Sequence, residues 1–264
     1  MKQLLLNDIK ERSNAMLKEF KSICKEHDIA FFLSNGTLLG AVKYGGFIPW
    51  DDDVDVLVPR QDYDRLMQVF QDTDKYQLFS IERTPAYSFP FAKFCDRETV
   101  KEEHNIDNGV EMGLSIDVFP LDVCTEHICG FWTQLKMKLL ILQLTLAKLI
   151  AFDDKAFYKK WIIRYCKKRG TAHFNQKILK LVKKESAKGN TLGGRLTWPL
   201  LGEKEILPLS VFAKTTELTF EGENYPVPAE YELYLRTLYG DYTKDLPVEE
   251  QVSHHSYTAY LKEN

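Results

Sequence analysis

The sequence of 264 residues has few of the features that mark exported or membrane-spanning proteins. Its longest apolar stretch, residues 139–152, is interrupted by Gln143, Thr145 and Lys148. It is also shorter than the roughly 20 apolar residues that a spanning helix needs. Near the amino terminus only three consecutive leucines precede charged residues, too few for a signal-peptide core. The five cysteines are scattered and odd in number, which is typical of a reducing compartment. We therefore expect a cytoplasmic protein.

The sequence also lacks a strong overall charge, with 35 lysine and arginine residues against 38 aspartate and glutamate residues, a net of -3. This total conceals an uneven distribution. Residues 131–190 contain 15 basic and 3 acidic residues, a net of +12, and the rest of the chain contains 20 and 35, a net of -15. This pattern argues against a nucleic-acid-binding protein of uniform charge. It favours a basic face that meets an anionic partner or surface.

Hydrophobic periodicity predicts an α+β protein. Helices are expected at residues 9–24, 38–44, 61–71 and 229–239, with long helices from about 130 to 188. Strands are expected at 29–33, 51–58, 76–81, 89–95 and 114–119, with a hairpin starting in 212–220. We divide the chain into a catalytic core at 1–129, a basic helical lobe at 130–190 and a C-terminal segment at 191–264 that completes the core.

The candidate chemistry concentrates in the run WDDDVDVLV at residues 50–58. Alternate side chains of a strand point to opposite faces, so Asp51, Asp53 and Asp55 share one face and the valines share the other. Carboxylates on one face repel one another, and a divalent cation removes that penalty. Oxygen ligands at this spacing favour Mg²⁺, with Mn²⁺ as the alternative.

Two structural alternatives for this run are weaker. A solvated edge strand is disfavoured by the adjacent Trp50 and by the valines, which indicate burial. A Ca²⁺ loop of the EF-hand type would need a glycine and a distal glutamate that the run lacks. A metal site is therefore the favoured interpretation.

Two neighbouring segments extend the candidate site. Asp117, in the apolar run 115–119, offers a further carboxylate from another strand, as metal sites for phosphoryl transfer usually need. Upstream, Gly36 and Thr37 lie between an expected strand and an expected helix. Backbone N–H groups at the start of a helix bind phosphate readily. Together these segments predict a site for a phosphorylated substrate.

Three ordered blocks resemble the signature of the LicD-type phosphorylcholine transferases. The first consists of GTLLGAV at 36–42 and GFIPWDDDVD at 46–55, and the second is IDVFPLD at 116–122. The third consists of FEG at 220–222, PVP at 226–228 and LYGDY at 238–242. This bacterial family is related to the fukutin-type phosphotransferases and belongs to the nucleotidyltransferase superfamily. The resemblance covers most of the chain.

The resemblance implies a nucleotidyltransferase-like mixed-sheet core that uses Mg²⁺ and a CDP-linked alcohol, typically CDP-choline. At matching positions, Asp53 and Asp55 would be the metal pair and Asp117 the third carboxylate, acting as a ligand or as the base for the acceptor hydroxyl. Asp51 would be a further ligand or would support the others. The acceptor would be a hydroxyl of a glycan or lipid-linked glycopolymer precursor of the teichoic acid or lipopolysaccharide type, and CMP would leave.

The same resemblance implies the donor-binding residues. Gly36 and Thr37 would form the donor-phosphate loop, and Lys43 would neutralise phosphate as a point charge. Trp50 is placed beside the carboxylates, where an aromatic face suits a quaternary ammonium. Near the carboxyl terminus, His254 is a candidate contact to the donor. The tyrosines at 231, 234, 239 and 242 are more typical of packing, with an aromatic cage for the quaternary ammonium as the alternative, for which Trp50 and Phe47 are better placed.

Alternatives remain open at this level. Nucleotidyl transfer to the acceptor would use the same carboxylates, as would transfer of another CDP-linked polyol phosphate. A binding module that has lost its chemistry is a third reading, disfavoured by the intact carboxylates. The basic lobe suits peripheral contact with an anionic membrane at the inner face. A solvated lysine-rich helical surface is its structural alternative.

Overall fold

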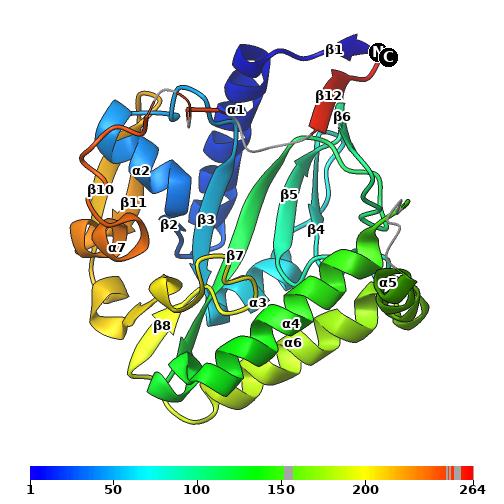
Figure 1. The fold of residues 1–264 in the computed structure, drawn as a ribbon. Helices are drawn as coiled ribbons and strands as arrows, with labels where there is room; N and C mark the ends of the chain where they lie inside the picture. Colours follow the sequence, from blue (N-terminus) through cyan, green and yellow to red (C-terminus); the bar gives the residue numbers. More distant parts are fainter. Residues whose placement is uncertain (152–156, 248, 250, 253–256, 264) are drawn as a thin grey trace.

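A computed structural model describes residues 1–151, 157–247, 249, 251–252 and 257–263 (Figure 1). The protein has a mixed α and β fold, which confirms the predicted α+β class. Its central sheet has the order β2 (Phe32–Leu33), β3 (Val54–Pro59), β7 (Ser115–Cys124), β5 (Ala92–Asp96) and β4 (Tyr76–Phe79). Strands β3 and β7 are parallel, and the other neighbours are antiparallel.

Helices cover both faces of this sheet (Figure 1). One face is covered by α1 (Leu6–Glu26) and α3 (Arg60–Val69), and the other by α4 (Phe131–Lys148) and α6 (Thr171–Ser186). Helix α1 forms because apolar residues recur at helical spacing, which buries Met16, Leu17 and Phe20 against the sheet. Helix α5 (Phe157–Arg169) packs beside α4. None of the described helices is long and apolar enough to span a bilayer.

The remaining elements extend the core. Strand β8 (Leu192–Gly194) pairs with the far half of β7 and with β9 (Ile206–Pro208). A second small sheet joins the two ends of the chain through β1 (Lys2–Gln3), β12 (Tyr257–Leu261) and β6 (Thr99–Glu103). Short 3₁₀ helices occupy Glu126–Cys129, Gly202–Glu205 and Leu209–Phe212. The hairpin β10 (Thr215–Phe220) and β11 (Glu223–Pro228) leads into α7 (Tyr231–Tyr239), beside α2 (Asn35–Tyr44).

Most predicted elements are present, but their bounds differ in places that concern the site. Strand β3 begins at Val54, so the expectation that the strand starts at Asp51 is wrong. A turn occurs there instead, because the Asp51 N–H donates to the Ile48 carbonyl at 3.0 Å. Strands β6, β8, β9 and β12 were not expected, since each is short and makes its pairings with distant segments.

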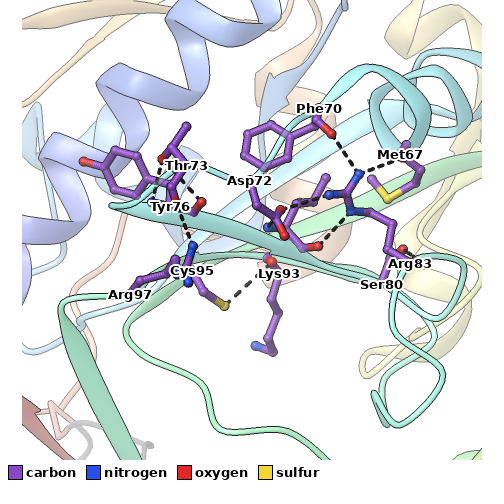
Figure 2. A network of polar contacts seen from close by, with 11 residues as sticks. Met67, Phe70, Asp72, Thr73, Tyr76, Ser80, Arg83, Lys93, Cys95 and Arg97 are labelled. Atoms are coloured by element: carbon purple, nitrogen blue, oxygen red, sulfur yellow. Dashed lines mark hydrogen bonds and ion pairs between the residues drawn. The ribbon is translucent and has the colours of Figure 1, made fainter.

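An arginine holds the end of α3 against the β4–β5 edge of the sheet (Figure 2). The Arg83 guanidinium donates to the carbonyls of Met67 at 3.1 Å and Phe70 at 2.8 Å, and to the Asp72 carboxylate at 2.9 Å. A cation at the carboxyl end of a helix satisfies carbonyls that lack partners within the helix. In Figure 2 the Lys93 side chain extends away from this network, toward the opposite face of the sheet.

The buried apolar residues form two clusters. The larger includes α1, α3 and the central sheet, and the smaller consists mainly of residues from α4, α6 and the segments that flank them. Cys166 of α5 and Leu196 after β8 belong to the smaller cluster. The basic lobe therefore has apolar packing of its own, while the division of the chain into three segments stays a prediction.

Candidate functional site

A cavity of about 500 Å³ opens at the amino-terminal end of β3. Three parts of the chain enclose it: the start of α2 with the loop to β3, the segment around Arg195 to Leu201, and the end of α7 with the loop after it. The predicted residues Gly36, Thr37, Lys43, Trp50, Asp51, Asp53 and Asp55 all line it. The cavity is therefore where most of the sequence-based candidates meet.

Three alternating carboxylates form one wall of the cavity. Asp51, Asp53 and Asp55 line it, whereas the intervening Asp52 is buried elsewhere. The Tyr257 hydroxyl donates to Asp52 Oδ2 at 2.6 Å, which fixes that side chain away from the cavity. The alternation therefore extends to Asp51 and Asp53, which precede the first residue of the strand, Val54.

A row of charged side chains crosses the sheet behind this wall. Asp55 on β3 is directly opposite Asp117 on the parallel strand β7, and Asp117 is opposite Lys93 on β5. Residues opposite one another on adjacent strands point to the same face. The Lys93 amine forms an ion pair with Asp117 Oδ1. Asp117 is not among the cavity-lining residues, so it reaches the site through its neighbour Asp55.

Lys93 was not expected from the sequence. Its side chain is buried and lies over the rings of Phe89 and Phe91, 5.0 and 5.4 Å from their centroids. An isolated lysine in an apolar run carries no signal of its own, and its role depends on the register between β5 and β7. The pairing makes it the counter-charge of Asp117.

The electrostatics of the carboxylate wall favour a cation. Burial raises the pKa of Asp55 above its usual range, and the nearby negative charges of Asp117, Asp53 and Asp51 raise it further. The Arg195 guanidinium opposes this rise in the pKa of Asp55. A bound divalent cation would stabilise the charged form of these carboxylates.

The described residues do not form a closed metal cage. Within them, no three Asp, Glu, His or Cys side chains are grouped tightly enough to hold an ion by themselves. Mg²⁺ often binds through one or two carboxylates and completes its shell with water and substrate phosphates. The oxygen-only donors Asp53 and Asp55, facing an open cavity, suit that mode of binding better than a site made wholly of protein ligands.

The start of α2 forms the cavity wall beside the carboxylates. The Thr37 hydroxyl accepts a hydrogen bond from the Asp55 N–H at 2.8 Å, which ties the helix to β3. At Gly36, a Cβ atom would lie 3.0 Å from Asp51 Oδ2, so a side chain there would push against the carboxylate. These contacts explain why a glycine and a small hydroxyl residue occupy this turn.

A buried polar network joins the start of α2 to the carboxyl-terminal third of the chain. The Asn35 amide oxygen accepts from Arg195 Nη1 at 2.7 Å, and its amide nitrogen donates to the Tyr234 hydroxyl at 2.8 Å. Arg195 also forms a two-pronged ion pair with Glu205, through Nε at 2.5 Å and Nη2 at 2.9 Å. Arg195 lines the cavity, so this network places a permanent positive charge near Asp55. No local pattern in the sequence identifies it.

Aromatic side chains form another part of the cavity lining. They are Tyr44, Trp50, Tyr239 and Tyr242, with Asp241 between the last two. The rings of Tyr44 and Trp50 meet edge to face at 6.4 Å. Tyr239 and Tyr242, for which the sequence favoured packing and left a cage open, both lie beside the cavity because α7 ends there.

Two predicted donor contacts remain, Lys43 and His254. Lys43 lines the cavity, and its amine donates to the Lys244 carbonyl at 3.0 Å and to Asp245 Oδ1 at 2.8 Å. It therefore ties the loop after α7 to α2 as well as adding positive charge. His254 lies outside the described residues.

A second buried lysine, Lys148, lies over the same Phe89 ring as Lys93. Lys148, at the end of α4, lies 3.2 Å from the centroid of the Phe89 ring, a contact that favours its ammonium form. Burial outweighs this and lowers the pKa of Lys148 to about 7, and the positive charges of Lys93 and Lys101 act in the same direction. Glu103 and the Asp117 carboxylate oppose the change.

Comparison with known proteins identifies one domain family and several relatives. The LicD/FKTN/FKRP nucleotidyltransferase domain family matches residues 28–134, which contain the carboxylate wall and Asp117. The lipopolysaccharide cholinephosphotransferase LicD of Haemophilus influenzae is 30% identical over 273 aligned residues, covering 99% of this chain and 100% of that protein. The mannosyltransferase regulator 4 of Saccharomyces cerevisiae is 36% identical over 124 residues, 43% of this chain and 10% of that protein. An uncharacterised protein of Rickettsia prowazekii is 28% identical over 34% of each chain.

Proposed function

The chain belongs to the LicD family, and from that premise we propose that it is a phosphorylcholine transferase with CDP-choline as its donor. The full-length similarity to the Haemophilus influenzae protein supports transfer of phosphocholine to lipopolysaccharide or a related cell-surface glycopolymer precursor. In the proposed reaction, an acceptor hydroxyl oxygen bonds to the choline-bearing phosphorus as its bond to the bridging diphosphate oxygen breaks. CMP leaves with the electron pair of that bond, and the hydroxyl proton passes to a base.

The observation that carries this proposal is the composition of the cavity lining. Its lining combines the carboxylates Asp51, Asp53 and Asp55 with the aromatic rings of Tyr44, Trp50, Tyr239 and Tyr242. CDP-choline has two groups that suit these residues, a diphosphate in its centre and a quaternary ammonium at one end. Aromatic faces attract a quaternary ammonium, and Asp241, which is paired with Lys244, also lines the cavity.

Mg²⁺, with Mn²⁺ as the alternative, is the proposed cofactor. Asp53 and Asp55 would hold it with the donor phosphates, and Asp51 would complete or support the set. When bound, the cation supplies charge neutralisation for the diphosphate and the leaving CMP. Lys93 occupies one oxygen of Asp117, which leaves the other oxygen for a ligand role; the role of Asp117 as the base for the acceptor hydroxyl is the alternative.

The residues of the chain itself would mainly position the donor. The start of α2, at Gly36 and Thr37, presents backbone N–H groups to a phosphate. Lys43 and Arg195 add positive charge to the same cavity. Because the Asn35 and Glu205 contacts hold Arg195 rigidly, little reorganisation is needed when the diphosphate binds.

The test is product analysis with the purified chain, CDP-choline, Mg²⁺ and a glycan acceptor. We expect free CMP and an acceptor that carries phosphocholine. The variants Asp53→Asn and Asp55→Asn should lower turnover by roughly two orders of magnitude or more, because a cation contributes several kcal/mol of charge stabilisation. Asp64→Asn on α3, an exposed carboxylate far from the cavity lining, is the matched control and should retain activity.

Other outcomes of this test would point to a different reaction or contradict a specific assignment. An acceptor that carries CMP would replace the proposal with nucleotidyl transfer, and activity only with another CDP-linked polyol would change the donor. Full activity of Asp53→Asn or Asp55→Asn would contradict the metal assignment. Failure of Mg²⁺ and Mn²⁺ to bind in calorimetry, together with no product, would indicate a binding module without chemistry.

A further inference from the structure

Helix α4 has two apolar faces, and the described structure covers one of them. Half of the exposed large apolar side chains in the described part of the chain fall within residues 131–165. On α4 these are Phe131, Trp132, Leu135, Leu139 and Leu142, with exposed fractions between 46% and 78%. Their spacing of three, four and seven residues places them in one stripe along the helix. The opposite side of α4 is buried in the lobe.

Basic side chains flank this stripe. Lys136 and Lys138 are exposed, and at 100° per residue they fall on its two sides. Helix α5 also combines exposed aromatic side chains, at Tyr158 and Tyr165, with an excess of lysine and arginine. Within the described residues of the lobe, the acidic side chain is Glu185, which is buried and paired with Lys188. The described surface of the lobe is therefore apolar and cationic together.

We propose that this stripe of α4, with the neighbouring apolar side chains of α5, docks on an anionic lipid surface. A helix with tryptophan, phenylalanine and leucine on one side and lysines at the border has the composition of a helix lying in the bilayer interface. Clustered lysines add attraction to anionic headgroups. A second copy of the chain is a poor occupant, because it would bring another segment of net charge +12 against the first.

The docking stripe adjoins the rim of the cavity. Leu200 and Leu201 line the cavity and are themselves exposed. They precede Gly202, where a Cβ atom would lie 3.7 Å from Gln134 Oε1 and 3.9 Å from Lys138 Cε on α4. The rim loop therefore packs against the edge of α4 that bears Lys138. Docking would bring the cavity near the headgroups, where a lipid-carried acceptor would be presented. The presence of such an acceptor rests on the proposed function, whereas the docking itself does not.

The experiment is sedimentation of the full chain with vesicles, without donor or acceptor. We expect binding to vesicles of phosphatidylglycerol mixed with phosphatidylcholine, weaker binding to phosphatidylcholine alone, and a decrease at high salt. The double variant Leu135→Gln/Leu139→Gln should reduce partitioning roughly tenfold or more, from the loss of two inserted leucines. Leu233→Gln on α7 is the matched control, since Leu233 is 45% exposed and Leu135 is 46% exposed.

Several results would overturn the docking proposal. One is absence of binding to anionic vesicles at low salt, and another is equal binding of the double variant and the Leu233→Gln control. A third is a dimer in sedimentation velocity that the double variant abolishes while vesicles stay unbound, because the stripe would then join two copies. Melting curves confirm that the variants are folded. Transfer of phosphocholine from CDP-choline to a glycan acceptor in vesicle-free buffer tests the proposed function separately, so the two can fail independently.

Discussion

Replacing Lys93 with methionine tests whether the charged row behind the cavity depends on its one buried cation. The change removes the partner of Asp117 while it keeps an unbranched apolar side chain against the rings that surround Lys93. The Lys93 and Asp117 side chains are 7% and 22% exposed, so water compensates the lost charge only in part. Breaking a buried pair from one side costs about 3–5 kcal/mol, and the partial exposure of Asp117 favours the lower end. At about 2–4 °C per kcal/mol, the melting temperature should fall by roughly 6–12 °C.

The assay is urea denaturation of four proteins: the parent, Lys93→Met, Asp117→Asn and the double variant. Because each single change strands the other charge, the double variant should be more stable than the sum of the single effects predicts, with a coupling energy of about 1–3 kcal/mol. Lys75→Met, at an exposed lysine just before β4, is the control and should stay within about 0.5 kcal/mol of the parent. A Lys93→Met protein as stable as this control, with no coupling to Asp117, would refute the reasoning.

Three other predictions concern the cavity and the lobe. Gly36→Ala should lower kcat/KM about tenfold or more with little loss of stability, since its Cβ meets Asp51 at 3.0 Å; unchanged steady-state kinetics would contradict this. Glu205→Gln should cost about 3 kcal/mol of stability and raise the donor KM, because Arg195 loses its charged partner; denaturation and kinetics on one preparation measure both. The pKa of Lys148 is about 7 in the folded state and 10.5 in the unfolded state. Between these two pH values the folded protein binds fewer protons than the unfolded chain. The free energy of unfolding should therefore rise with pH there, by up to about 1.4 kcal/mol per pH unit. In Lys148→Met this rise should be smaller, and parallel stability profiles of variant and parent would show the assignment to be wrong.

Local pattern was sufficient to predict the carboxylate wall. Asp51, Asp53 and Asp55 alternate in the sequence, and all three line the cavity although the strand begins only at Val54. The place of Gly36 and Thr37 beside the start of a helix was also predicted, but α2 begins at Asn35, three residues before the expected start at residue 38. The same local reasoning predicted the start of β3 three residues too early. Alternation along the sequence gives no sign of the preceding turn, in which the Ile48 carbonyl accepts from the Asp51 N–H.

Other residues of the site depend on contacts between distant segments. Lys93 meets Asp117 through the pairing of β5 with β7, and Arg195 reaches the cavity through Asn35 and Glu205. Tyr239 is a further example of what periodicity misses. Its spacing within α7 indicates packing, but the helix ends at the cavity and Tyr239 lines it. Periodicity describes one element at a time and carries no information on which elements become neighbours.

By itself the sequence determined the α+β class, the alternating carboxylates, the glycine and threonine beside them and the separation of a basic lobe from an acidic remainder. These features follow from side-chain order along one element, which sterics and charge settle locally. Only the tertiary structure decided which apolar face of α4 is covered and which remains exposed beside Lys138, and which cations face the carboxylates. The physical reason is that burial and charge pairing depend on strand register and helix packing, which bring together residues far apart in the chain.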